Sequence, residues 1–184
     1  MASSLVPAPN DNLVIVVVYA DSLCRTNYSG IDRFLNELKT KPDFLLAQNV
    51  KGALSDDPRN SFLTALGGEG IYSTTEAMQN EVKIRGGTKT YYNLIMAKSE
   101  HEGEQIPSEL QCYCAGKFTF NDKSILMISY NGVDIRDPFD LEKDLKMFLK
   151  LKKENKCKHL IIGGTFGFKM EQLKSNMKGG MFDK

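Results

Sequence analysis

His159-Leu160-Ile161-Ile162-Gly163-Gly164-Thr165-Phe166-Gly167 is an apolar strand that runs directly into a pair of glycines. A strand end fixes the position of the residue that follows it, and glycines allow a ligand or another backbone to come close. The residue delivered here, Thr165, carries no charge. The pattern therefore predicts a site at the end of this strand, with a neutral side chain where chemistry often requires an ionisable one.

The size and charge of the chain describe an ordinary globular protein. Its 184 residues suit one domain or a large part of one, and 41% of them are hydrophobic, which is enough for a core. The net charge of +1 gives no overall attraction to polyanions, although residues 146–184 contain ten lysines and only three acids. A solvated helix face and a terminal tail are the usual source of such asymmetry, and a weak nucleic-acid contact through residues 169–184 is the alternative.

Targeting and membrane signals are missing from the sequence. The longest apolar run, residues 13–20, is too short to cross a bilayer, and it follows Asp11 rather than a basic segment. We therefore expect no membrane partner and a cytoplasmic or nuclear location.

The four cysteines do not predict a disulfide framework in a chain of this length. Cys112 and Cys114 would share one face of a strand, where direct pairing is geometrically awkward. His101 and His159 are the two histidines, so a zinc site built from cysteine and histidine is not indicated. We expect reduced thiols and no metal or other cofactor.

Hydrophobic periodicity predicts the order β-α-β, a loop-rich middle, three strands and a final α-β pair. Strands are expected at residues 13–19, 43–50, 91–98, 112–120, 123–130 and 160–163, and helices at 30–39 and 140–152, with a weaker short helix at 59–66. The alternation in 112–120 is typical of a half-buried strand, joined to the next one by a tight turn at Asn121-Asp122. Mixed parallel and antiparallel signals favour a layered α/β architecture over a purely doubly wound sheet. The expected organisation is a flexible lead (1–12), one domain (13–168) and a basic tail (169–184).

Four motifs, in this order and with sensible gaps, resemble the endonuclease/exonuclease/phosphatase superfamily, which includes deoxyribonucleases, apurinic endonucleases and inositol polyphosphate phosphatases. They are Val18-Tyr19-Ala20, residues 42–50 (PDFLLAQNV), residues 128–132 (ISYNG) and residues 162–167 (IGGTFG). The resemblance covers residues 13–168. It implies a four-layered α/β sandwich, of which this chain would hold the N-terminal part, truncated at its C-terminus.

The same resemblance implies a site without its catalytic groups. Members of the superfamily use a glutamate to bind Mg²⁺, an Asp-x-Asn pair to orient water and phosphate, a histidine to polarise the phosphoryl oxygens and an asparagine after the first strand. The aligned positions here are all neutral: Ala20, Asn49, Asn131, Thr165 and Gly167. The resemblance therefore implies no catalytic residue and no metal ligand. The favoured interpretation is a degenerate, non-catalytic relative of metal-dependent phosphodiesterases and nucleases, and the alternative is a Mg²⁺-dependent phosphodiesterase or endonuclease with an altered site.

Other polar residues and motifs carry less weight. Asp43 is expected to be a cap or turn residue at a strand entry, and Asp56-Asp57 to be a solvated turn. Glu76 and Glu81 cannot be aligned with the superfamily, and Asn27-Tyr28-Ser29 would matter as a glycosylation site only in a secreted protein.

Two further expectations concern phosphate binding and partners. Residues 163–167 could be read as a phosphate loop, but they lack the Gly-Lys-Ser/Thr ending. A missing second half of the sandwich would leave a sheet edge open, so we expect self-association or a protein partner that covers it.

Overall fold

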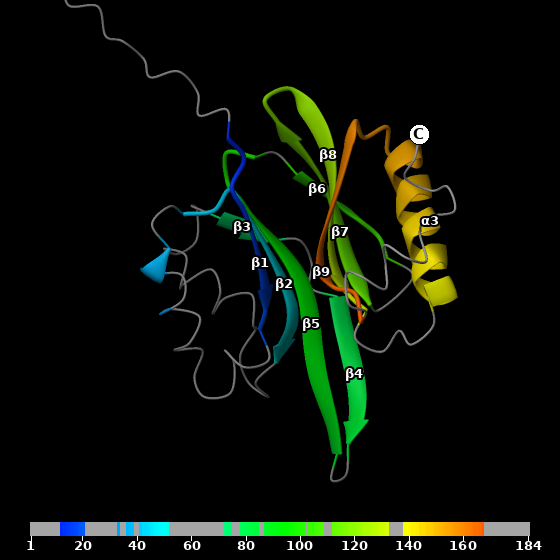
Figure 1. Cartoon of the computed structure of the whole chain (residues 1–184). Helices are drawn as coiled ribbons and strands as arrows, with labels where there is room; N and C mark the ends of the chain where they lie inside the picture. Colours follow the sequence, from blue (N-terminus) through cyan, green and yellow to red (C-terminus); the bar gives the residue numbers. More distant parts are fainter. Residues whose placement is uncertain are drawn as a thin grey trace, which may run out of the picture.

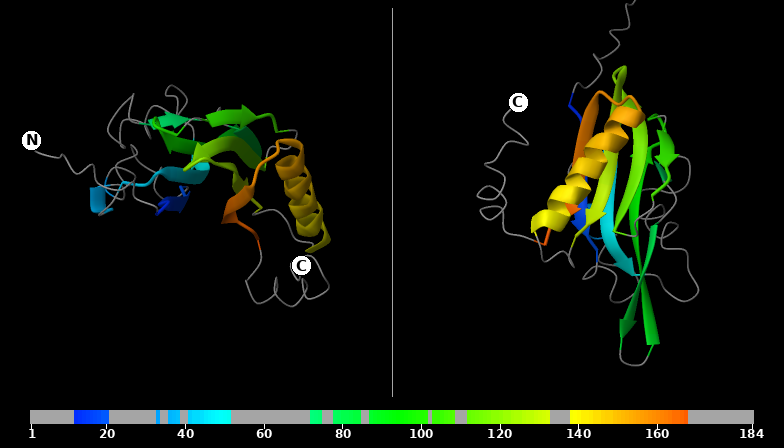
Figure 2. Two further views of the ribbon diagram at one scale, coloured as in Figure 1. Left: turned by 90° about the horizontal axis from the view of Figure 1, so that it is seen from above. Right: turned by 90° about the vertical axis from the view of Figure 1, so that its right-hand side faces the viewer.

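The computed structural model describes residues 12–20, 33, 36–38, 41–51, 72–74, 78–84, 87–101, 103–108, 112–132 and 138–167. In these residues two sheets face each other, and a long helix packs on the outer face of one sheet (Figures 1 and 2). The elements are β1 (Ile15–Tyr19), β2 (Phe44–Lys51), β3 (Tyr72–Thr74), β4 (Met78–Ile84), β5 (Gly87–Lys98), β6 (Gly103–Ile106), β7 (Tyr113–Phe120), β8 (Lys123–Asn131), α3 (Pro138–Glu154) and β9 (His159–Thr165).

The first sheet has the order β1-β2-β5-β3, and β4 also pairs with β5. β1 and β2 are parallel, whereas β5 runs antiparallel to β2, β3 and β4. The hairpin of β4 and β5 extends well beyond the rest of the sandwich (Figure 1).

The second sheet has the order β6-β7-β8-β9, with β8 and β9 parallel and the other pairs antiparallel. The expected tight turn is present between β7 and β8, where Asn121 and Asp122 both have positive φ, 46° and 60°. Two successive positive φ values define the turn whose twist matches that of a hairpin. The mixture of parallel and antiparallel strands confirms the layered α/β prediction.

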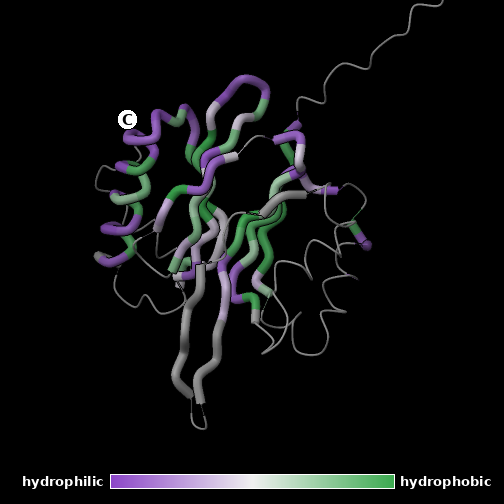
Figure 3. The backbone as a smooth tube through the Cα atoms, turned by 180° about the vertical axis from the view of Figure 1, so that it is seen from behind, coloured by the Kyte–Doolittle hydropathy of each residue, from purple (hydrophilic) through white to green (hydrophobic). Residues whose placement is uncertain are grey.

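An apolar core fills the space between the two sheets. Figure 3 shows that many of the most hydrophobic residues lie in the central strands. The rings of Phe44 in β2 and Phe118 in β7 meet edge to face, with centroids 5.0 Å apart. The buried members of this core are Phe44, Leu46, Ile95, Ala97, Cys114, Phe118, Ile125 and Met127. Packing of these side chains fixes the position of one sheet on the other. It therefore also fixes where the strand ends of the two sheets lie relative to each other.

A second core lies between β7, β8, β9 and α3. Phe148 of α3 is fully buried, and its ring contacts Tyr113 and Tyr130 edge to face, at 5.1 and 5.5 Å between centroids. The helix thereby covers the outer face of the sheet, so Tyr113 and Ala115 are buried on that side of β7, while Cys114 and Phe118 are buried on the other. The half-buried pattern predicted for 112–120 therefore fails at the start of β7 but holds toward its end, where Phe118 is buried and Thr119 is exposed. Cys112 packs on the helix side, whereas Cys114 and Phe118 share the other side, as predicted.

The predicted elements agree with the structure to within a few residues, and the middle of the chain is richer in strands than expected. The helix expected at 140–152 is α3, and within the helix expected at 30–39 the described residues Arg33, Asn36 and Glu37 are helical. β3, β4 and β6 were not predicted. The short helix at 59–66, the tail at 169–184, the lead apart from Asn12, and Asp56, Asp57, Glu76 and the 27–29 sequon lie outside the described residues.

No helix in the described part of the chain is both long and apolar enough to cross a membrane.

Candidate functional site at the strand ends

The carboxyl ends of β1, β2, β8 and β9 meet at one pole of the sandwich, here called the carboxyl pole. Figure 1 shows the two pairs, and the strands of each pair are parallel. Gln48 of β2 joins the two pairs through hydrogen bonds. Its Nε2 donates to Ser129 Oγ at 2.9 Å and to the Gly163 carbonyl at 3.5 Å. The residues that follow these three positions therefore lie at the same end of the molecule.

Both glycines of the β9 motif lie in close packing, Gly163 against side chains and Gly164 against backbone. A Cβ on Gly163 would lie 2.6 Å from Leu46 Cδ1 and 2.7 Å from Val17 Cγ2 of the facing sheet. Gly164 has φ of 151°, and a Cβ there would lie 1.8 Å from the Tyr130 carbonyl oxygen. The glycine pair thus allows β9 to lie close to the β8 backbone and to the facing sheet. Close approach of another backbone was expected for these glycines, beside close approach of a ligand.

Asn49 occupies an irregular position in β2. Its φ is 56°, and the pairing of β2 with β5 shifts between Ala47 and Val50. Asparagine tolerates this left-handed conformation better than most residues. Its Nδ2 donates to Tyr19 Oη at 2.9 Å, and its backbone N–H donates to Asn93 Oδ1 at 3.3 Å. The side-chain amide that replaces the aligned glutamate is therefore held by β1.

The other aligned positions lie at the ends of their strands or just beyond them. Ala20 is fully buried, and its N–H donates to the Gln48 carbonyl at 2.8 Å. Asn131 and Thr165 are register partners at the ends of β8 and β9, and the Thr165 carbonyl accepts from the N–H of Gly132 at 2.7 Å. The structure thus brings Ala20, Asn49, Asn131 and Thr165 to one pole, whereas Gly167 lies two residues beyond β9, in exposed backbone with φ of 69°.

Two buried acceptors in this region have no hydrogen-bond partner among the described residues: Gln48 Oε1 and Asn131 Oδ1. Buried acceptors without partners are uncommon, and each invites a donor from a ligand or water. Within the described part of the chain, the groups named at the pole are amides, hydroxyls and a methyl group. They can donate and accept hydrogen bonds, but they supply neither an anion nor a group that exchanges protons near neutral pH.

A magnesium ion does not fit this set of side chains. Mg²⁺ is bound through carboxylates and water, and the amide of Asn49 is already directed to Tyr19. In the described residues, the one group of three acidic or histidine side chains close enough to share an ion is Asp43, Glu100 and His101. That group lies at the opposite pole, where β2 begins and β5 ends.

Sequence reasoning identified the aligned positions but not the residues that hold them. Tyr19 was noted only as part of the first motif, and Asn93 was hidden in an apolar strand. A polar residue inside an otherwise apolar run, as at Asn93 or Gln48, is the signal that could have identified them, because buried polar groups need partners.

No family model matches the sequence, and no curated protein matches it. Solved structures do match in fold. An endonuclease/exonuclease/phosphatase family protein from Leptotrichia buccalis C-1013-b aligns with a TM-score of 0.61 at 12% identity, covering 89% of this chain and 70% of that one. The endonuclease domain of TRAS1, a telomere-specific non-LTR retrotransposon, aligns with a TM-score of 0.53 at 13% identity, covering 89% and 68%.

TDP2 of D. rerio, complexed with single strand DNA product, aligns with a TM-score of 0.52 at 15% identity, covering 89% of this chain and 64% of that one. The chain therefore has the α/β sandwich fold of the endonuclease/exonuclease/phosphatase proteins, as the motifs implied. At these identities the likeness concerns the fold alone.

Proposed function

We propose that this protein is a non-catalytic relative of the metal-dependent phosphodiesterases and nucleases that share its fold. One observation carries the proposal: Ala20, Asn49, Asn131 and Thr165 gather at the carboxyl pole, and all four are neutral. A bound metal ion typically contributes several kcal/mol, roughly, to such hydrolysis. Because none of these four side chains is a carboxylate that could hold the ion, the function we propose for them is binding.

The binding we propose uses hydrogen bonds. The buried Asn131 Oδ1, which has no partner among the described groups, would accept a donor from the ligand, and the exposed Tyr19, whose hydroxyl accepts from Asn49 Nδ2, lies beside Asn49. Two fold neighbours are an endonuclease domain and a DNA-bound TDP2, so phosphodiester ligands are the first class to test.

The test is a hydrolysis assay of the purified full chain on plasmid DNA, RNA and a generic phosphodiester, with and without Mg²⁺ or Mn²⁺. We expect no turnover above background with any substrate. Reproducible turnover that a chelator abolishes would overturn the proposal and establish the alternative, a Mg²⁺-dependent phosphodiesterase with an altered site.

A variant with two restored acids provides a second check. Asn49→Glu combined with Thr165→Asp returns two carboxylates to the pole, but Ala20, Asn131 and Gly167 stay neutral. We expect this variant to remain inactive in the same assay, because the groups that orient water and polarise phosphate are still missing. Clear Mg²⁺-dependent cleavage by the variant would show that the other neutral positions are not needed.

A further inference from the structure

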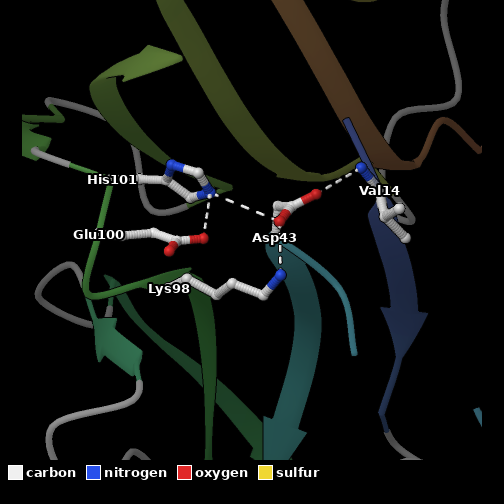
Figure 4. Close-up of polar contacts among 5 residues, drawn as sticks. All are labelled: Val14, Asp43, Lys98, Glu100 and His101. Carbon is white, nitrogen blue, oxygen red and sulfur yellow. Dashed lines mark hydrogen bonds and ion pairs between the residues drawn. The ribbon is translucent and has the colours of Figure 1, made fainter. Parts of the chain in front are cut away.

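A second polar cluster lies at the opposite pole of the sandwich (Figure 4). Asp43 immediately precedes β2, Lys98 ends β5, and Glu100 and His101 follow in the adjoining turn. Asp43 and His101 are both buried, at 8% and 9% exposure. Charged and ionisable side chains are rarely buried to this degree unless they are paired or bind an ion.

The histidine nitrogen in this cluster has no hydrogen-bond partner. His101 Nε2 is buried and faces two carboxylates, 3.6 Å from Asp43 Oδ1 and 4.0 Å from Glu100 Oε1. Two ligands about 2.1 Å from a tetrahedral metal ion lie about 3.4 Å apart. The observed separations are therefore close to those of atoms that share one ion.

The two buried groups are oriented by their surroundings. The His101 ring stacks on Phe44 with centroids 4.9 Å apart and meets Phe120 edge-on at 5.4 Å. Asp43 Oδ2 accepts the backbone N–H of Val14 at 2.8 Å, which leaves Oδ1 directed toward the histidine (Figure 4). Contacts of this kind position metal ligands before an ion arrives.

We propose that Asp43, Glu100 and His101 form a binding site for one divalent transition-metal ion of the Zn²⁺ class, with water as a fourth ligand. One imidazole and two carboxylates are ordinary zinc ligands. Glu100 is largely exposed, with 68% of its side chain accessible, and it can move the short distance needed to close the site. The ion links the start of β2 to the turn after β5, which are far apart along the chain.

Lys98 is the competitor for this site. Its Nζ lies 2.6 Å from Asp43 Oδ1, so the ammonium group must leave that oxygen when an ion binds. A quarter of the lysine side chain is accessible to solvent, which gives it a route out. In the sequence, zinc ligation was considered only for cysteines with histidines, because Asp43 and His101 are far apart along the chain.

Binding is tested on the full chain with Zn²⁺ in thermal unfolding and with Co²⁺ by visible absorption. We expect Zn²⁺ to raise the unfolding temperature and Co²⁺ to give a tetrahedral spectrum. His101→Gln and Glu100→Gln should each weaken binding by at least about tenfold, because loss even of groups that only orient ligands costs about 10- to 100-fold. His159→Gln, a change in the other histidine of the chain, is the matched control and should leave affinity unchanged.

Lys98→Met separates a metal site from a purely structural ion-pair cluster. Removing the competing ammonium should raise metal affinity by about tenfold or more if Asp43 is a ligand, as the removal of one nearby like charge predicts. Absence of binding in both the native chain and Lys98→Met would overturn the proposal. Binding that persists unchanged in His101→Gln would also overturn it, because the ion would then lie elsewhere, for example at the cysteines.

Discussion

Asp43 is a buried carboxylate whose contribution to stability depends on pH. Burial raises its pKa, but the hydrogen bond from Lys98, the backbone hydrogen bond from Val14 and the positive charge of Lys98 outweigh burial and hold the pKa below its usual value. A lowered folded-state pKa gives stability that is complete above the unfolded-state value and is lost as the pH falls through the folded-state value. Asp43→Asn should therefore cost about 2–3 kcal/mol at pH 7 and progressively less in acid.

Urea unfolding of the native chain and Asp43→Asn, at pH 7 and at intervals down to about pH 3, measures this difference. A gap in unfolding free energy that stays constant over the whole range would show that the charge of Asp43 does not stabilise the fold.

Gly164 occupies the most constrained backbone position among the described glycines. Gly164→Ala would place a Cβ 1.8 Å from the Tyr130 carbonyl oxygen, so β8 and β9 would have to separate. We expect a loss of about 3 kcal/mol or more in unfolding free energy, as strained backbone and steric overlap combine.

Gly167→Ala is the control for this change. It also has positive φ but lies in exposed backbone, and it should cost only about 1–2 kcal/mol. Equal losses in the two variants would show that positive φ alone, and not the contact with Tyr130, makes Gly164 necessary.

At the level of single residues, the resemblance assigned the neutral positions to the ends of strands that the hydrophobic pattern had indicated, and their correspondence to catalytic positions stays a prediction. It did not reveal their contacts, since the partners of Asn49 lie in β1 and β5 and reach it only through folding. The Asp43–His101 cluster was missed for the same reason. Its members are separated along the chain, and neither residue type is unusual at a strand entry or turn.

The helix α3 contributes its apolar stripe to the second core. Phe148 is fully buried against Tyr113 and Tyr130, whereas the next residue, Leu149, is 39% exposed. Phe148→Ala should lower the unfolding free energy by about 3–5 kcal/mol, because it removes buried area and leaves a cavity. Leu149→Ala should cost less than about 1 kcal/mol in the same denaturation experiment. Similar losses for the two would mean that the helix does not pack through this face.

The elements that periodicity predicted well are long and strongly patterned, as α3 and β8 are. β3 and β6 have three and four residues, too few for a repeat to stand out, and β4 (MQNEVKI) is too polar to resemble a buried strand. The two-sided burial of β7 depends on α3, which follows it in sequence. The hydropathy pattern of a strand shows which of its residues are polar, but it does not show which element elsewhere in the chain will pack on the strand.

At the scale of the whole molecule, β1 and β9 end their sheets. Within the described residues each pairs on one side only, and Val17 and Tyr19 of β1 are 47% and 43% exposed. Unpaired strands with exposed apolar side chains recruit other chains. We expect the purified protein to self-associate in light scattering, and Val17→Lys to shift it toward monomer.

Leu149→Lys is the matched control for this prediction, since it places the same charge at an exposed apolar position on α3. It should leave the association unchanged. A monodisperse monomer of the native chain, with no dye-binding apolar surface, would contradict the expectation.

The steric need for Gly163 and Gly164 does not depend on catalysis. Leu46, Val17 and the Tyr130 carbonyl would meet a side chain there whether or not the neighbouring position carries an acid. In a chain under no selection for hydrolysis, mutations would therefore replace an acidic residue beside the glycines and leave the glycines unchanged. A genome search based on the glycine pair would therefore select chains by their packing and not by the residue after the pair, which is Thr165 here.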